Sequence, residues 1–107
     1  MDIPKQFPLP YFAVIFSSRK KHSDDAFTQL SDYLDELVLS QPGYLGHETV
    51  GSDPSITISY WKDLDAIKNW RENPEHAAAI KKSKELWFKD YSIRIAEVQR
   101  DYYWESK

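Results

Sequence analysis

The chain has 107 residues, enough for one domain, because two separate cores of half this size would each need disulfides or metal for stability. It contains no cysteine, which excludes disulfide frameworks, cysteine-ligated zinc, iron–sulfur clusters and thiol nucleophiles. With 17 acidic and 14 basic residues the net charge is −3, so the chain lacks the basic excess typical of proteins whose main partner is nucleic acid.

The hydropathy of the chain and its content of aromatic residues further restrict the class of protein. No apolar run approaches the roughly 18 residues that a membrane span needs, and the first four residues do not resemble a signal or transit peptide. We therefore expect a soluble, cytoplasmic protein without membrane contact. Trp, Tyr and Phe make up 15% of the chain. A domain this small leaves much of its surface exposed, so this many rings favour a second subunit or a bound ligand.

The first half of the chain predicts a strand followed by a helix. Residues 1–10 are interrupted by three prolines and should be irregular, whereas residues 11–16 are all apolar and predict a strand that is covered on both faces. Residues 19–22 are expected to form a solvated loop. Ser23 is expected to cap an amphipathic helix, whose apolar side chains recur at spacings of three and four and which ends before Pro42.

The middle of the chain predicts a β-hairpin. Two candidate strands, residues 44–50 and 55–61, are joined by a loop at 51–54 that contains Gly, Ser, Asp and Pro. Alternation along the second strand places Thr57, Ser59 and Trp61 on one face and Ile56, Ile58 and Tyr60 on the other.

The second half predicts two helices and a strand. Asp63 is placed to cap a short helix. Asn73 and Pro74 are typical of a helix start, and the helix they open should run to about Lys89. Residues 91–104 then predict a long strand.

This order of elements predicts an α+β fold, the ferredoxin-like βαββαβ arrangement with an antiparallel sheet. The helices can cover only one face of such a sheet, so the second apolar face of the first strand calls for another cover. A second copy of the sheet would supply one, and we therefore expect a homodimer.

Several segments of the second half resemble the antibiotic biosynthesis monooxygenase family of dimeric α+β barrel proteins, in an uncharacterised bacterial branch. They are residues 59–70, 73–77, 87–91 and 93–98. The resemblance implies a single such domain over residues 1–107. It further implies a pocket between the sheet and the helices, bordered by Trp61, Trp70, His76, Trp87 and Arg94. The family includes cofactor-independent oxygenases and haem-degrading enzymes.

Two side chains are catalytic candidates. His76 could act as a general base for a phenol, or could serve only to cap its helix or bind a neighbouring backbone group. Arg94 could neutralise a carboxylate or enolate, or could form an ion pair with Glu97 or Glu48.

The substrate-binding candidates are Trp61, Trp70, Trp87, Thr57 and Ser59. The three tryptophans could surround a planar substrate, or could fill the core between sheet and helices, as their helical spacing also predicts for Trp70 and Trp87. No metal site is expected, because His47 and Glu48 point to opposite faces of a strand and no two histidines are four residues apart.

These observations leave three functional hypotheses. The first is a monooxygenase that needs no cofactor and acts on a small phenol-like or quinol-like substrate. The second is a non-catalytic dimer that binds a small apolar metabolite, in a stress response or in sensing, since the first strand and residues 55–61 lack the asparagine that the family's enzymes use. The third is a haem-binding or haem-degrading protein, although Ile80 occupies the position that the resemblance gives to the haem ligand.

Overall fold

Four strands form one antiparallel sheet in the order β2-β3-β1-β4. The computed structural model describes residues 3–107, so the first two residues of the predicted irregular segment lie outside it. The strands are β1 (Tyr11–Lys20), β2 (Tyr44–Val50), β3 (Ser55–Trp61) and β4 (Phe88–Val98). The helices are α1 (Asp25–Val38), α2 (Leu64–Glu72) and α3 (Pro74–Leu86). The ferredoxin-like α+β prediction is confirmed, with the second helical segment broken in two.

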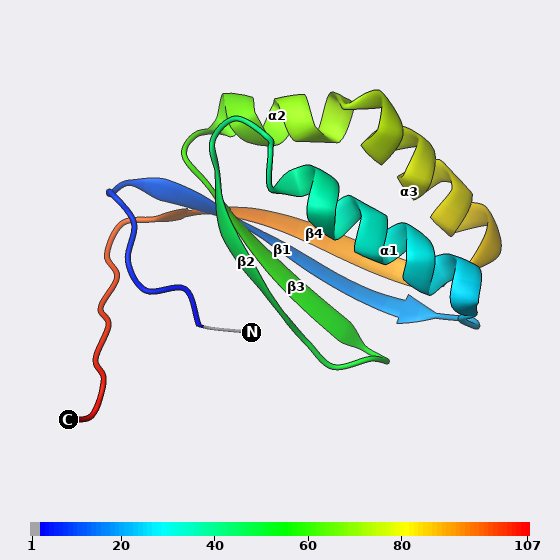
Figure 1. Cartoon of the computed structure of the whole chain (residues 1–107), viewed down its shortest axis with the longest axis horizontal. Helices are drawn as coiled ribbons and strands as arrows, with labels where there is room; N and C mark the ends of the chain where they lie inside the picture. Colours follow the sequence, from blue (N-terminus) through cyan, green and yellow to red (C-terminus); the bar gives the residue numbers. More distant parts are fainter. Residues whose placement is uncertain (1–2) are drawn as a thin grey trace.

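All three helices lie on one side of the sheet, and the described segments before β1 and after β4 lie on the other (Figure 1). Paired residues of adjacent strands share a face, so the register assigns side chains to the two sides. Phe12 pairs with Trp61 and Val14 pairs with Ser59, and these four belong to the helix side. We call the opposite side the open face; it carries Ile15 and its partner Ile58.

Strand boundaries differ from the prediction at both long strands. β1 continues through Arg19 and Lys20, which were expected in a loop, because Arg19 pairs with Asp90 and its guanidinium binds that carboxylate, with Nε 2.9 Å from Oδ1. The last strand begins earlier and ends earlier than expected, at Phe88 and Val98. The hairpin strands have the predicted bounds.

The helix caps follow sequence signals with one correction. Asp24, and not Ser23, is the N-cap of α1: its carboxylate accepts a hydrogen bond from the backbone of Phe27. Asp63 caps α2 as predicted, and the side chain of Asn73 accepts two backbone hydrogen bonds at the start of α3.

The N-terminal segment covers part of the open face. Phe7 packs edge-on against Tyr11, with ring centroids 5.2 Å apart, and also lies against Tyr60. Tyr11 is buried and donates a hydrogen bond of 2.8 Å to the carboxylate of Asp101. The chain therefore covers this end of β1 itself and leaves the rest of the open face without a layer over it.

Candidate active site

An aromatic stack leads from the core to the surface on the helix side. It consists of Trp61 at the end of β3, Trp70 on α2 and His76 on α3. The Trp61 and Trp70 rings stack with centroids 6.4 Å apart, and Trp70 and His76 stack at 4.1 Å with an interplanar angle of 10°. Trp61 is only 1% exposed, while Trp70 and His76 are half-buried. The outer end of this stack is thus the part that a ligand could reach.

The hydrogen bonding of His76 fixes which ring nitrogen is free. Its Nδ1 lies 3.0 Å from the backbone carbonyl of Trp70, and a carbonyl only accepts, so Nδ1 carries the proton. Nε2 has no hydrogen-bond partner. Every fully buried side-chain nitrogen or oxygen of the described residues has one, so Nε2 is not fully buried and solvent reaches it. Burial lowers the pKa of His76, partly offset by the bond to Trp70. Burial thus favours the neutral imidazole, whose Nε2 lone pair is open to solvent.

The predicted hydroxyl contacts already have protein partners. The Ser59 hydroxyl accepts a hydrogen bond of 2.9 Å from the indole of Trp61, and Thr57 lies 3.0 Å from the hydroxyl of Thr49. Both strand residues share a face with Trp61, as alternation predicted, and the register puts this face on the helix side. Ser59 therefore holds the inner ring of the stack in place.

Trp87 lies far from this stack and belongs to a different cluster. It follows α3 next to Phe88, which pairs with Lys20, whereas Trp61 pairs with Phe12 at the other end of β1. Eight residues of strand separate those two ends, roughly 26 Å. The expectation that Trp87 borders the same space as Trp61 is wrong.

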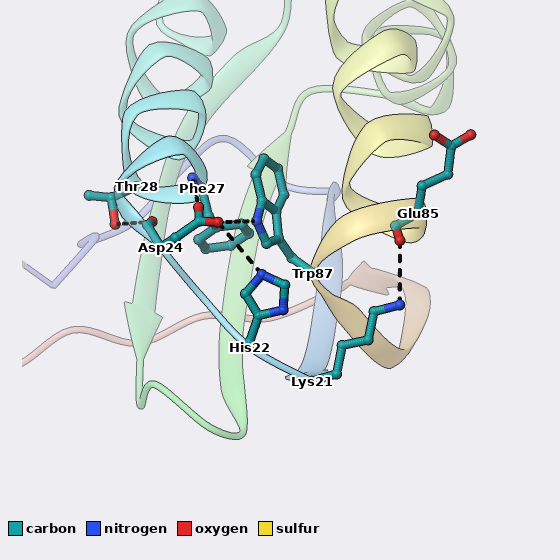
Figure 2. A network of polar contacts seen from close by, with 7 residues as sticks. All are labelled: Lys21, His22, Asp24, Phe27, Thr28, Glu85 and Trp87. Carbon is teal, nitrogen blue, oxygen red and sulfur yellow. Dashed lines mark hydrogen bonds and ion pairs between the residues drawn. The ribbon is translucent and has the colours of Figure 1, made fainter.

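Figure 2 shows what Trp87 does instead. Its indole nitrogen donates a hydrogen bond of 3.2 Å to Asp24, which also lies 3.6 Å from His22. The ring packs edge-on against Phe27, and its backbone carbonyl accepts from Lys21. Trp87 thus joins the end of α3 to the start of α1, a structural role. Two hydrogen bonds to its carboxylate lower the pKa of Asp24. The bond from the Phe27 backbone has the larger effect, and the bond from the Trp87 indole has the smaller one.

Arg94 lies on the open face. It pairs with Ile15 across β1 and β4, and its guanidinium donates to the hydroxyl of Ser92 at 3.1 Å. The ion pair of Arg94 with Glu48 or Glu97, which the sequence left open, is not found among the described residues. Glu48 instead accepts a hydrogen bond from Tyr60, and Glu97 accepts one from Gln99. The structure does not bring Arg94 to the side of the sheet that carries His76.

Two isoleucines on β4 also lie on the helix side and were not among the predicted site residues. Ile93 pairs with Phe16 and Ile95 with Val14, so both face the helices, yet they are 51% and 47% exposed. Val14 packs against the core cluster that Trp70 also joins, which places Ile95 one strand from that cluster. Residue alternation along β4 puts Ile93 and Ile95 on the face opposite Arg94, and this signal could have indicated the two isoleucines from the sequence.

The arrangement defines a ferredoxin-like α+β protein with a half-buried histidine and an aromatic stack on the helix side of its sheet. Residues 10–82 match the sequence profile described as "Antibiotic biosynthesis monooxygenase". The chain belongs to this family, as its resemblance predicted.

Three similar proteins extend the comparison. The chain is 42% identical over 103 residues to the uncharacterized protein YqjZ of Bacillus subtilis, covering 94% of this chain and 90% of that one. The fold is similar to SnoaB, a cofactor-independent oxygenase of Streptomyces nogalater, with a TM-score of 0.72, 14% identity and coverage of 86% and 96%. It is also similar to a dimeric ferredoxin-like protein of unknown function from Thermobifida fusca, with a TM-score of 0.68, 15% identity and coverage of 87% and 95%. No helix within residues 3–107 is long and apolar enough to cross a membrane.

Proposed function

We propose that the protein is a homodimeric monooxygenase that acts without a cofactor on a small aromatic substrate of phenol or quinol type, with His76 as the general base. The observation that carries this proposal is the state of His76: Nδ1 is held by the Trp70 carbonyl, and Nε2 is accessible. Family membership and the similarity in fold to a cofactor-independent oxygenase support it.

The proposed chemistry uses the substrate as the reductant. Nε2 of His76 accepts the phenol proton, and the imidazolium that results lies beside the phenolate and stabilises its charge. The phenolate passes one electron to O2, and the phenoxyl radical and superoxide combine at a ring carbon. The imidazolium returns its proton to the peroxide, and loss of water from the resulting hydroperoxide gives a quinone, so one phenol and one O2 yield one quinone and one H2O.

Apolar side chains on the helix side supply the proposed contact surface for the ring. Trp70 offers a flat half-buried indole, and Ile95 and Ile93 offer exposed aliphatic surface beside their strand partners Val14 and Phe16. A planar substrate buries apolar area against such groups and keeps its polar end for the histidine. Arg94 and Trp87 have no part in this proposal.

Oxygen uptake with a panel of hydroquinones and polyphenols tests the proposal. Removal of a general base lowers the rate by about 10²–10⁴-fold, so His76→Gln should lose turnover by a factor in this range. His22→Gln is the matched control, because His22 lies beside Asp24 in the other cluster and should keep wild-type turnover. Uptake at background level for the whole panel, or equal turnover in both variants, contradicts the assignment.

A second candidate function is binding of a small apolar metabolite without catalysis. It is favoured by the hydroxyls of Ser59 and Thr57, which are engaged with Trp61 and Thr49 and so are less available to a reacting substrate. A ligand that binds only the folded protein raises its melting temperature. A metabolite screen that shows stabilisation lost in Trp70→Ala, without oxygen uptake, would select this function over the first.

The dimer is proposed to form through the open face. Ile15, Ile58 and Ile56 lie along its centre, and Ile56 and Val50 are exposed in the single chain. The fold neighbour from Thermobifida fusca is described as dimeric, and the cysteine-free composition suits a reducing cytoplasm. Sedimentation equilibrium should give a dimer that Ile58→Lys dissociates, while a stable monomer at micromolar concentration would contradict this proposal.

A further inference from the structure

One row of paired residues crosses the open face from one edge of the sheet to the other. In the sheet order β2-β3-β1-β4, it consists of Glu48, Ile58, Ile15 and Arg94. The row therefore carries a carboxylate at the β2 edge and a guanidinium at the β4 edge, with two aliphatic side chains between them. Glu48 is half-buried and Arg94 is exposed in the single chain.

The two charged ends of this row have no oppositely charged partner among the described residues. The strands pair two further charged residues on the open face, Arg19 and Asp90, and these bind each other. Arg94 donates one hydrogen bond to a hydroxyl of its own strand, and Glu48 accepts one from the hydroxyl of Tyr60. A guanidinium has several N–H donors and a carboxylate several acceptor positions, so both groups can form further bonds.

Within one chain these two groups lie far apart. Three strand spacings separate β2 from β4, about 14 Å in total, and the two isoleucines lie between them. An ion pair with Glu48 was one of the possibilities that the sequence left open for Arg94, and the single chain does not form it within residues 3–107. A second copy of the chain can bring the two charges together.

The symmetry of a dimer decides whether it does so. A two-fold axis between two facing sheets can run across the strands or along them. An axis across the strands places each strand over its own copy, so Arg94 and Glu48 of the partner subunit stay at opposite edges. An axis along the strands places β4 over the partner's β2. Because both residues belong to one row, they then face each other at the same height, and symmetry repeats the contact at the other edge.

The spacing between packed sheets suits this contact. Sheets that pack face to face lie about 10 Å apart, a gap that arginine and glutamate side chains can close from opposite sides. The isoleucines of the row fill the space between the two pairs. The N-terminal segments, which lie on Tyr11 and Tyr60, meet at one end of such a dimer, where the twist of the two sheets moves their corners apart.

We propose that Arg94 of each copy forms an ion pair with Glu48 of the partner subunit, and that these two symmetric pairs set the orientation in which the chain recognises a second copy of itself. The inference rests on the proposed dimer through the open face. Charge pairs between an arginine and a carboxylate fix the register of an interface and disfavour partners that present a like charge. The hydroxyl of Tyr60 holds the carboxylate at this edge.

Charge reversal tests the pairs, because mixing two variants distinguishes contacts between copies from contacts within one chain. In Arg94→Glu two carboxylates face each other at both contacts, and in Glu48→Arg two guanidinium groups do. Each variant should therefore dissociate at concentrations about a hundredfold higher than the wild-type dimer. An equimolar mixture of the two variants restores both pairs and should form a heterodimer with about wild-type affinity. Sedimentation equilibrium measures the affinities, and native mass spectrometry identifies the heterodimer.

Glu97→Arg is the matched control for charge reversal on β4. Glu97 is exposed and pairs with Phe12, which puts it on the helix side of the sheet. The change in net charge is the same as in Glu48→Arg, but it lies away from the proposed interface. The Glu97→Arg dimer should dissociate at the wild-type concentration.

Neutral variants supply a second measurement that places no new charge on the sheet. Arg94→Gln and Glu48→Gln should each weaken the dimer about tenfold. The double variant should lose no more than either single variant, because both changes remove the same contact. Losses that add in the double variant would mean that the two residues act separately.

The outcomes separate the ion pairs from the dimer on which they rest. A wild-type chain that stays monomeric in sedimentation contradicts both. The ion pairs are overturned, and the dimer is left standing, if the charge-reversal variants dimerise as tightly as the wild type, if they fail to combine when mixed, or if the losses of the neutral variants add.

Discussion

Trp61 and Trp87 are the two largest fully buried side chains, each 1% exposed, but they lie in regions with different chemistry. The indole of Trp61 donates to the neutral hydroxyl of Ser59, and its ring continues outward through Trp70 to His76. The indole of Trp87 donates to the carboxylate of Asp24 and is enclosed by neighbouring segments (Figure 2). Equal burial therefore does not give equal roles.

The difference lies in what is beyond each ring. Outward from Trp61 come a half-buried ring and a histidine nitrogen that solvent reaches, which is the arrangement a ligand site needs. Beyond Trp87 come a helix N-cap and a strand end, which are structural elements. A buried aromatic residue becomes part of a site only through partially exposed neighbours.

The largest expected effect comes from Trp87→Ala. Removing a large buried ring leaves a cavity, and such changes cost about 3–5 kcal/mol of stability. The indole bond to Asp24 is lost as well. Urea unfolding measures the free-energy change, with Leu64→Ala as the exposed control. A loss below about 1 kcal/mol, within the range of ordinary substitutions, would show that this region is not a structural centre.

A second prediction concerns the pH dependence that His76 gives to stability. Its pKa is lowered in the folded protein from the ordinary value of 6.5, so the unfolded state binds more protons as the pH falls below 6.5. Stability from this group is complete above 6.5 and is lost at lower pH. The cost of His76→Gln in urea unfolding should thus be larger at pH 7.5 than at pH 5. Equal costs at both values would mean that the ring is not desolvated.

Asp24→Asn is expected to act at the other region and in a different pH range. The pKa of Asp24 is lowered from its ordinary value of 3.8 by hydrogen bonds from the Phe27 backbone and the Trp87 indole. Its contribution is present above pH 3.8 and disappears as the pH falls through the lower, folded value. Thermal unfolding should show a deficit in the variant at pH 7 that shrinks below pH 3.8. A deficit that does not change with pH argues for a role of side-chain shape alone.

Local sequence signals predicted the fold well because each is decided within a few residues. The hairpin strands 44–50 and 55–61, the Asp63 cap and the Asn73–Pro74 helix start all follow from alternation, turn composition or capping chemistry. The cap of α1 was misplaced by one residue because Ser23 and Asp24 are both good caps. Asp24 also accepts a hydrogen bond from Trp87, 63 residues away, which no local signal could show.

The candidate site was harder to predict because it depends on which elements end up adjacent. Helical spacing correctly put Trp87 on an inward face, but it could not tell that the ring lies at the far end of the sheet from Trp61. Alternation separated Arg94 from Ile93 and Ile95, while the side on which each lies required the register with β1. Sequence periodicity predicts which face of a helix or strand a residue lies on, whereas its contacts with other elements follow only from the tertiary structure.

The smallest expected effect is that of Arg94→Gln, and its smallness is what sharpens the comparison. Arg94 is exposed on the open face and bonds only to Ser92 of its own strand, so its replacement should change monomer stability by no more than about 0.5 kcal/mol. Because the sheet separates it from His76, turnover or ligand-induced stabilisation on the helix side should match wild type at concentrations where the dimer is saturated. If Arg94→Gln instead abolishes that activity as His76→Gln does, side chains from both faces of the sheet contribute to the site. The separation of a candidate site around Trp61 from a structural region around Trp87 then fails.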